Sequence, residues 1–287
     1  MNSMAKDEHI IEAIGRCRIT IRNGKVIDVG PPAISSCPLA ERFAKPVREI
    51  TSEAVRENIE ARIQEFGMCT PDRAVYAEGE FVGFGASELI GNGLSHGILD
   101  CAVLASDGAG TVLAMTPGLV QGIGGRMSGL VKTIPIPDVI DRIERNGGMV
   151  LDRSEGCIDQ LAGTRLAYAR GYRLVAVTIA TAEAAEEIRR EFPEALIVAV
   201  HTTGTTPEEA ERLASTADLI TACASVHIRS VAGKRALLQA GTAIPVFAMT
   251  KRGKDLILSK VRWTKDQVLV QGAKLPYAGE KQPKPLV

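Results

Sequence analysis

The sequence predicts an α/β protein: a parallel or mixed sheet covered by helices on both faces, preceded by a small N-terminal α+β unit. From about residue 81 onward, short aliphatic runs alternate with helical segments, which is typical of strand–helix repeats. Before that point the pattern is that of a hairpin followed by one helix. We therefore expect an N-terminal unit over residues 1–80 and an α/β ligand-binding domain over 81–274. Residues 275–287 carry three prolines without periodicity and predict a mobile tail.

Two elements are expected in the N-terminal unit. Residues 17–29 contain two alternating runs joined by Asn23-Gly24, which is a strong signal for a two-residue hairpin turn. A helix is expected over residues 52–66, because Thr51 can cap its start and Gly67 can end it.

The expected strands of the α/β domain are short apolar runs separated by helical segments. They cover residues 101–105, 149–152, 174–179, 195–200, 219–223 and 245–249. One intervening helix should begin at Pro137 and stop at Gly147, and another should cover residues 158–170. A third should begin after Thr206, where a capping hydroxyl is followed by Pro207 and an acidic first turn.

Composition excludes several classes of protein. Lys plus Arg and Asp plus Glu each count 34, and aromatic residues make up only 4% of the 287 residues. Nucleic-acid binders usually show a basic excess with interleaved aromatics, so we expect no nucleic-acid partner. No apolar run approaches the roughly 20 residues of a membrane span, and no signal core opens the chain, which predicts a cytoplasmic protein. The six cysteines form no C-x-x-C pair, so we expect no local metal motif.

The most informative stretch is the glycine-rich segment 106–133. Glycine amides can approach a ligand closely, and nearby cationic side chains would favour a phosphate or carboxylate. The segment fails the dinucleotide pattern, because Met127 stands where the third glycine belongs, and it fails the P-loop pattern after Gly129. A tight loop packed for structural reasons is the alternative. The predicted anion site comprises Gly122, Gly124, Gly125, Arg126, Ser128, Gly129 and Lys132, joined by Thr202 and Thr203 at a strand end.

Three further candidates lie where strands end. Because ligands bind beyond the carboxyl ends of strands in open α/β sheets, Asp107, His201 and Cys223 are candidate catalytic residues. Asp107 could hold a metal, accept a ribose hydroxyl or act as a base, and it could equally cap its own turn. His201 could activate the Cys223 thiol as a nucleophile. The alternative for that pair is a buried thiol beside a hydrogen-bonded histidine.

Several segments resemble methanogenesis marker protein 8, an archaeal family. They are residues 7–15 (DEHIIEAIG), 81–88 (FVGFGASE), 107–112 (DGAGTV), 121–133 (QGIGGRMSGLVKT), 201–204 (HTTG), 221–225 (TACAS) and 233–241 (GKRALLQAG). The resemblance spans nearly the whole chain except the tail. It implies a cytoplasmic protein of methanogenic archaea but brings no reaction, cofactor or catalytic residue.

A fainter likeness concerns residues 85–106 and 115–125. They look somewhat like the first domain of beta subunits in deazaflavin-coenzyme hydrogenases and dehydrogenases, whose iron–sulfur cysteine motifs are missing here. Two hypotheses follow. The first is a protein, enzyme or not, that binds a small anionic coenzyme or nucleotide at the glycine-rich loop. The second is a non-catalytic maturation or assembly partner of a methanogenesis enzyme such as methyl-coenzyme M reductase.

Overall fold

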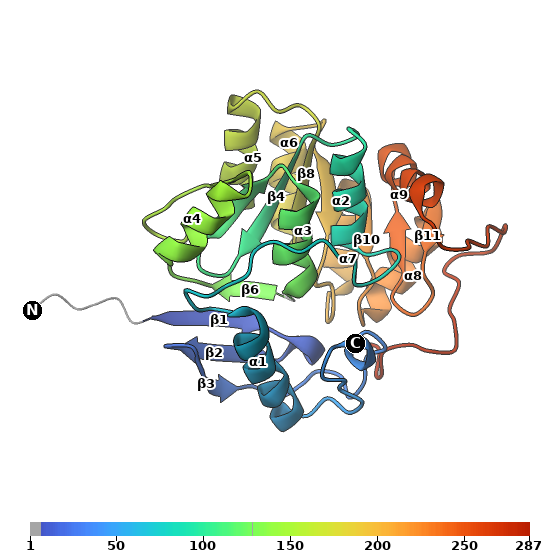
Figure 1. Ribbon diagram of the computed structural model, residues 1–287. Coiled ribbons are helices and arrows are strands. Elements are labelled where there is room, and N and C mark those ends of the chain that lie inside the picture. Colours follow the sequence, from blue (N-terminus) through green and yellow to red (C-terminus); the bar gives the residue numbers. More distant parts are fainter. Residues whose placement is uncertain (1–6, 128) are drawn as a thin grey trace, which may run out of the picture.

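The computed structural model of the protein describes residues 7–127 and 129–287. A large sheet with helices on both faces occupies most of the molecule, and a small sheet with one helix lies below it (Figure 1). This arrangement confirms the predicted fold class, including the N-terminal α+β unit.

The large sheet is mixed and has eight strands in the order β11-β12-β10-β9-β8-β4-β5-β7. Its strands are β4 (Cys101–Ser106), β5 (Gly110–Ala114), β7 (Gly148–Val150), β8 (Val175–Ile179), β9 (Leu196–Ala199), β10 (Leu219–Thr221), β11 (Leu238–Ala240) and β12 (Val246–Ala248). The central strands β10, β9, β8 and β4 are parallel, and antiparallel strands flank them on both sides. The carboxyl ends of the four parallel strands therefore share one edge.

Helices cover both faces because successive strand residues point in opposite directions. On one face lie α2 (Ala86–Ser95), α3 (Pro117–Ile123), α4 (Pro137–Arg145) and α9 (Lys251–Trp263). On the other lie α5 (Gln160–Ala169), α6 (Ala182–Glu191), α7 (Pro207–Thr216) and α8 (Val226–Arg235). In β4, for example, Ala102 and Leu104 join the first core, whereas Cys101 and Val103 join the second.

The small sheet has the order β3-β2-β1-β6 and packs against α1 (Ser52–Phe66). Its strands are β1 (Glu8–Glu12), β2 (Arg18–Arg22), β3 (Lys25–Val29) and β6 (Gly129–Lys132). The core of this unit also contains Ala224, which follows β10 of the large sheet. The N-terminal unit thus lies against the carboxyl edge of the large sheet, where the sequence predicts a site.

Local signals placed several elements correctly. The expected hairpin is formed by β2 and β3, and α1 has the expected bounds, with Thr51 accepting a bond from the amide of Ala54 and Gly67 ending the helix at φ 71°. Helix α7 begins with a complete capping box between Thr206 and Glu209.

Four strands were not foreseen, namely β1, β5, β6 and β11. Strands β5 and β6 lie inside the glycine-rich segment, where glycine content favours a loop. Strand β5 forms because its backbone groups pair with β4 and β7, and strand β6 forms because it pairs with β1. Such pairing between distant segments outweighs the weak local preference for a loop.

The chain end from residue 275 runs from the large sheet to the N-terminal unit. The amide of Tyr277 donates to Gln239 of β11, and the amide of Lys284 donates to the carbonyl of Ser36. At the last residue, the amide of Val287 donates to the carbonyl of Ala224. The end of the chain therefore bridges both units beside the carboxyl end of β10.

Candidate functional site

Asp107, at the end of β4, lies in a buried ion pair. Its carboxylate accepts bonds from the Nε of Arg73 at 2.9 Å and from the amide of Cys69 at 2.7 Å. Both charged side chains are fully buried, and Arg73 also donates to the carbonyl oxygen of Gly122 at 3.0 Å. The pair therefore attaches the segment after α1 to both β4 and α3.

A second buried polar cluster lies beside it and includes a histidine to which the sequence assigned no role. His9 Nδ1 lies 2.7 Å from Thr133 Oγ1, and the amide of Gly108 donates to the same hydroxyl oxygen at 2.8 Å. Burial lowers the pKa of His9, so the neutral imidazole is favoured. These bonds hold β1 against the turn that follows β4.

The glycines of α3 permit close packing. A β-carbon at Gly122 would lie 2.1 Å from the carbonyl oxygen of Val75, and one at Gly118 would lie 2.2 Å from the ring of Tyr76. The backbone around Val75 can cross α3 at this distance only if both positions lack a side chain. Gly124 and Gly125 follow in the 3₁₀ turn η3 (Gly124–Arg126), next to the side chains of Ser87 and Gln121.

Arg126 ends this turn and lies near a second arginine. Its guanidinium carbon is 5.1 Å from the ring centroid of Phe66, and its carbonyl oxygen accepts a bond from Nη1 of Arg62 at 3.1 Å. The guanidinium of Arg62 lies over the ring of Phe43 at 4.5 Å. Within residues 7–127 and 129–287, neither arginine has a carboxylate within 4.0 Å. Both arginines therefore lie where α1 contacts the glycine-rich turn.

The pKa values of these arginines reflect that environment. Burial, aided by the charge of Arg73 and opposed by Glu65, lowers the pKa of Arg62 to about 10. Burial and then the charge of Arg73 also lower the pKa of Arg126, and the charge of Glu65 opposes them. Both guanidinium groups are thus held charged at a free-energy cost that a nearby anion would reduce.

Other residues of the predicted anion site lie in different surroundings. Lys132, on β6, donates to the Glu8 carboxylate of the small sheet at 2.9 Å and so already has an anionic partner. Gly129 packs on Glu12, and a β-carbon there would lie 3.8 Å from the Cδ2 atom of His201. Ser128 lies outside the described residues.

The ends of β9 and β10 lie side by side, because the two strands pair in parallel. The Thr202 hydroxyl donates to the carbonyl oxygen of Thr221 at 2.6 Å, and the Thr203 hydroxyl accepts from the amide of Ala224 at 3.2 Å. From the N-terminal unit, Arg16 donates to the carbonyl oxygen of Thr203 at 2.8 Å. These threonines connect the two strand ends and receive the N-terminal unit.

His201 and Cys223 both adopt left-handed backbone conformations, at φ 57° and 41°. Such angles are uncommon for residues other than glycine and persist only where surrounding contacts hold them. Burial lowers the pKa of His201 to about 4 and raises the pKa of Cys223. A neutral imidazole and a protonated thiol favour a structural role for His201 and Cys223. That His201 activates the Cys223 thiol as a nucleophile stays a prediction.

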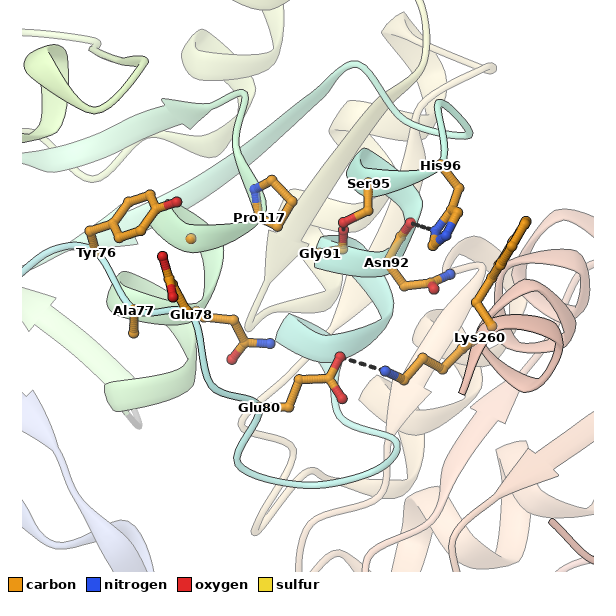
Figure 2. Close-up of a pocket in the computed structure, with 13 residues that line it drawn as sticks. Tyr76, Ala77, Glu78, Glu80, Gly91, Asn92, Ser95, His96, Pro117 and Lys260 are labelled. Atoms are coloured by element: carbon orange, nitrogen blue, oxygen red, sulfur yellow. Dashed lines mark hydrogen bonds and ion pairs between the residues drawn. The ribbon is translucent and has the colours of Figure 1, made fainter. Parts of the chain in front are cut away.

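A cleft that the sequence did not reveal opens on the other side of α3. It has a volume of about 390 Å³ and lies between α2, α3, the end of α9 and the segment that carries Tyr76 (Figure 2). Its lining includes Tyr76, Glu78, Gly91, Ser95, Gln121 and Trp263. The only sequence signal is the pair of small residues four apart on α2, Gly91 and Ser95, which lie on the same helix face.

The fold defines a mixed α/β protein whose N-terminal unit covers the carboxyl edge of its large sheet. Over residues 9–262 the chain matches the model of a family described as "Uncharacterized protein conserved in archaea (DUF2099)". It is also 39% identical over 286 residues to an uncharacterized protein of Methanocaldococcus jannaschii, across 98% of this chain and 100% of that protein. The chain therefore belongs to this archaeal family.

Two features are absent from the described residues, a membrane-spanning helix and a cluster of metal ligands. No helix among them combines the length and the apolar character that crossing a membrane requires. In the same part of the chain, no three side chains of His, Cys, Asp or Glu come together in a group that could hold a metal ion.

Proposed function

We propose that the protein binds a small ligand carrying a phosphate or carboxylate group between α1 and the turn η3. The observation that supports this most directly is the pair Arg62 and Arg126, which has no carboxylate partner among the residues described. Guanidinium groups are planar, and their N–H donors match two oxygens of a carboxylate or phosphate at once. The ligand would be a coenzyme or nucleotide that binds at the end of the glycine-rich segment.

The surroundings of the pair support an anion rather than a neutral ligand. Both guanidinium groups lie over phenyl rings, which hold them without neutralising them. Burial and the charge of Arg73 lower the pKa of both arginines, and the charge of Glu65 offsets this only in part. A bound anion would offset both effects, so its binding should raise these pKa values and stabilise the fold.

The resemblance to methanogenesis marker protein 8 suggests which class of anionic ligand the protein binds. We infer that the archaeal family is this marker family, that it acts in the cytoplasm and that the anion belongs to a coenzyme of methanogenesis. Phosphate and carboxylate groups are the features that the arginine pair would recognise.

Thermal unfolding in the presence of candidate anions tests the proposal. Inorganic phosphate, pyrophosphate, nucleotides and purified methanogenic coenzymes would each be titrated against the wild type, Arg126→Ala and Arg18→Ala. Arg18 is an exposed arginine of β2 and serves as the matched control. A ligand at 100 times its dissociation constant should stabilise the wild type and Arg18→Ala by about 2.7 kcal/mol. Equal stabilisation of Arg126→Ala, or none for any anion, would reject the site.

One observation favours the second candidate function, a maturation or assembly partner of methyl-coenzyme M reductase. Leu269 and Val270, between α9 and the chain end, are 82% and 78% exposed. Adjacent exposed aliphatic side chains are typical of surfaces that bind another protein. A Leu269→Ser/Val270→Ser variant should lose co-purification with methyl-coenzyme M reductase in a methanogen. Retained co-purification, or no association of the wild type, would exclude this role for the segment.

A further inference from the structure

The cleft beside α3 contains a buried side-chain amide that has no hydrogen-bond partner among the described residues. Gln121 is only 6% exposed, lines the cleft and makes no hydrogen bond to the described residues. Its Nε2 atom is 3.9 Å from the position of a β-carbon on Gly91, so this end of the amide lies toward α2 across the cleft floor. A buried amide of this kind is normally satisfied by water or by a ligand.

The glycine opposite Gln121 is not required by helix packing. Gly91 is inside the ten-residue helix α2, where glycine is less favourable than alanine. A β-carbon at Gly91 would lie 3.7 Å from Pro117, which is ordinary contact. By contrast, a β-carbon at Gly93 would lie 2.7 Å from Leu99 and could not be accommodated. Gly91 therefore keeps the cleft floor open at a cost to the helix.

Two aromatic side chains that line the cleft are partly exposed, Tyr76 at 43% and Trp263 at 52%. Trp263 is stacked on His96 with ring centroids 4.4 Å apart, and the guanidinium of Arg262 lies 5.3 Å from its ring centroid. The Tyr76 ring lies against Gly118, and no aromatic ring or guanidinium of the described residues stacks on it. Figure 2 shows Tyr76 and Glu78 on the side of the cleft opposite His96.

The charges of the cleft favour a cation. Lys260 is neutralised by its ion pair with Glu80. Glu78 is exposed and has no ion pair with any residue of the described chain. An anion would be repelled here, whereas a cation could contact the Glu78 carboxylate and the tyrosine ring together.

We propose that this cleft is a second binding site, which takes a small organic cation with an ammonium or guanidinium group. The cationic group lies between the Tyr76 ring and the Glu78 carboxylate, and the Gln121 amide binds a polar group at the other end of the ligand. The site is separate from Arg62 and Arg126 and selects the opposite charge. The cation site and the anion site can therefore be tested independently.

Trp263 provides a direct measure of occupancy, because it is the chain's only tryptophan and lines the cleft. Its fluorescence would be recorded while agmatine, n-butylammonium or tetramethylammonium is added to the full-length protein. We expect a saturable change for at least one cation, with a dissociation constant of about 10 mM or lower. Phosphate and acetate should give none, and added salt should weaken the response.

Two pairs of variants locate the site. Glu78→Gln should weaken cation binding about tenfold or more, whereas Glu49→Gln, which removes an exposed carboxylate of the N-terminal unit, should leave binding unchanged. Gly91→Leu should abolish binding by filling the floor, and Gly91→Ala should fold at least as stably as the wild type. No saturable response to any of the three cations, tighter binding of phosphate, or unchanged affinity in Glu78→Gln would each overturn the proposal.

Discussion

Two arginines lie at the same distance from one phenyl ring, yet their electrostatic surroundings differ. The guanidinium carbons of Arg73 and Arg126 are each 5.1 Å from the ring centroid of Phe66. Arg73 is fully buried and neutralised by Asp107, whereas Arg126 is half-buried and has no carboxylate within 4.0 Å in the described chain. The difference indicates that Arg73 serves the fold and that Arg126 is available to a ligand. The two arginines differ in whether a carboxylate neutralises them, not in their distance from Phe66.

The largest loss of stability should come from breaking the ion pair between Arg73 and Asp107. Arg73→Ala would leave Asp107 buried without its cation and should lower the free energy of unfolding by about 3–5 kcal/mol. Urea unfolding of the purified variant measures this. The double variant Arg73→Met/Asp107→Asn removes both charges and keeps an acceptor for the amide of Cys69, so it should recover part of the loss. If Arg73→Ala unfolds like the wild type, the pair is not structural and the comparison fails.

A second prediction extends the comparison to the strand end that carries His201. Its folded pKa of about 4 lies below the ordinary 6.5, so the unfolded chain binds more protons between these values. The neutral ring contributes about 3 kcal/mol to the free energy of unfolding. This contribution is complete above pH 6.5 and is lost as the pH falls toward 4.

His201→Asn tests this contribution, because asparagine tolerates the left-handed angle and does not titrate. Free energies of unfolding measured from pH 7.5 to 4.5 should fall less steeply for the variant than for the wild type. Parallel curves would show that His201 is not held neutral by burial.

Two helical glycines should respond in opposite directions to the same substitution. Gly122→Ala should destabilise the fold by about 1–3 kcal/mol, because its methyl group would meet the backbone at Val75. Gly91→Ala should instead stabilise it by about 0.5–1 kcal/mol, since the methyl group fits and alanine favours the helix. Thermal unfolding measures both. If both substitutions changed the stability in the same direction, the distinction between the packed Gly122 and the cleft residue Gly91 would be refuted.

The smallest loss of stability is expected for Arg126, which has no carboxylate within 4.0 Å among the described residues. Arg126→Ala removes only a stacked, half-buried cation and should cost about 0.5–1 kcal/mol without ligand. Its consequence should appear with ligand, as the loss of the anion-induced rise in melting temperature described above. A loss comparable to that of Arg73→Ala in the ligand-free protein would mean that Arg126 is also structural.

How much the sequence could reveal depended on the range of the interaction. The glycine-rich segment pointed to Arg126, but Arg62, its proposed partner in binding, lies in α1 and carries no local signal of its own. Lys132 looked equivalent to Arg126 in the sequence, and only the pairing of β6 with β1 brought it to Glu8. The cleft went unnoticed because its lining comes from four separate segments.

The sequence by itself determined the local elements of this protein: the hairpin around Asn23-Gly24, the bounds of α1 and the start of α7. Caps, turns and periodicity act over a few residues, so they can be read along the chain. Only the tertiary structure decided which charges are neutralised and which glycines are packed. Arg73 and Asp107 are 34 residues apart, and their pairing depends on how the N-terminal unit meets the large sheet.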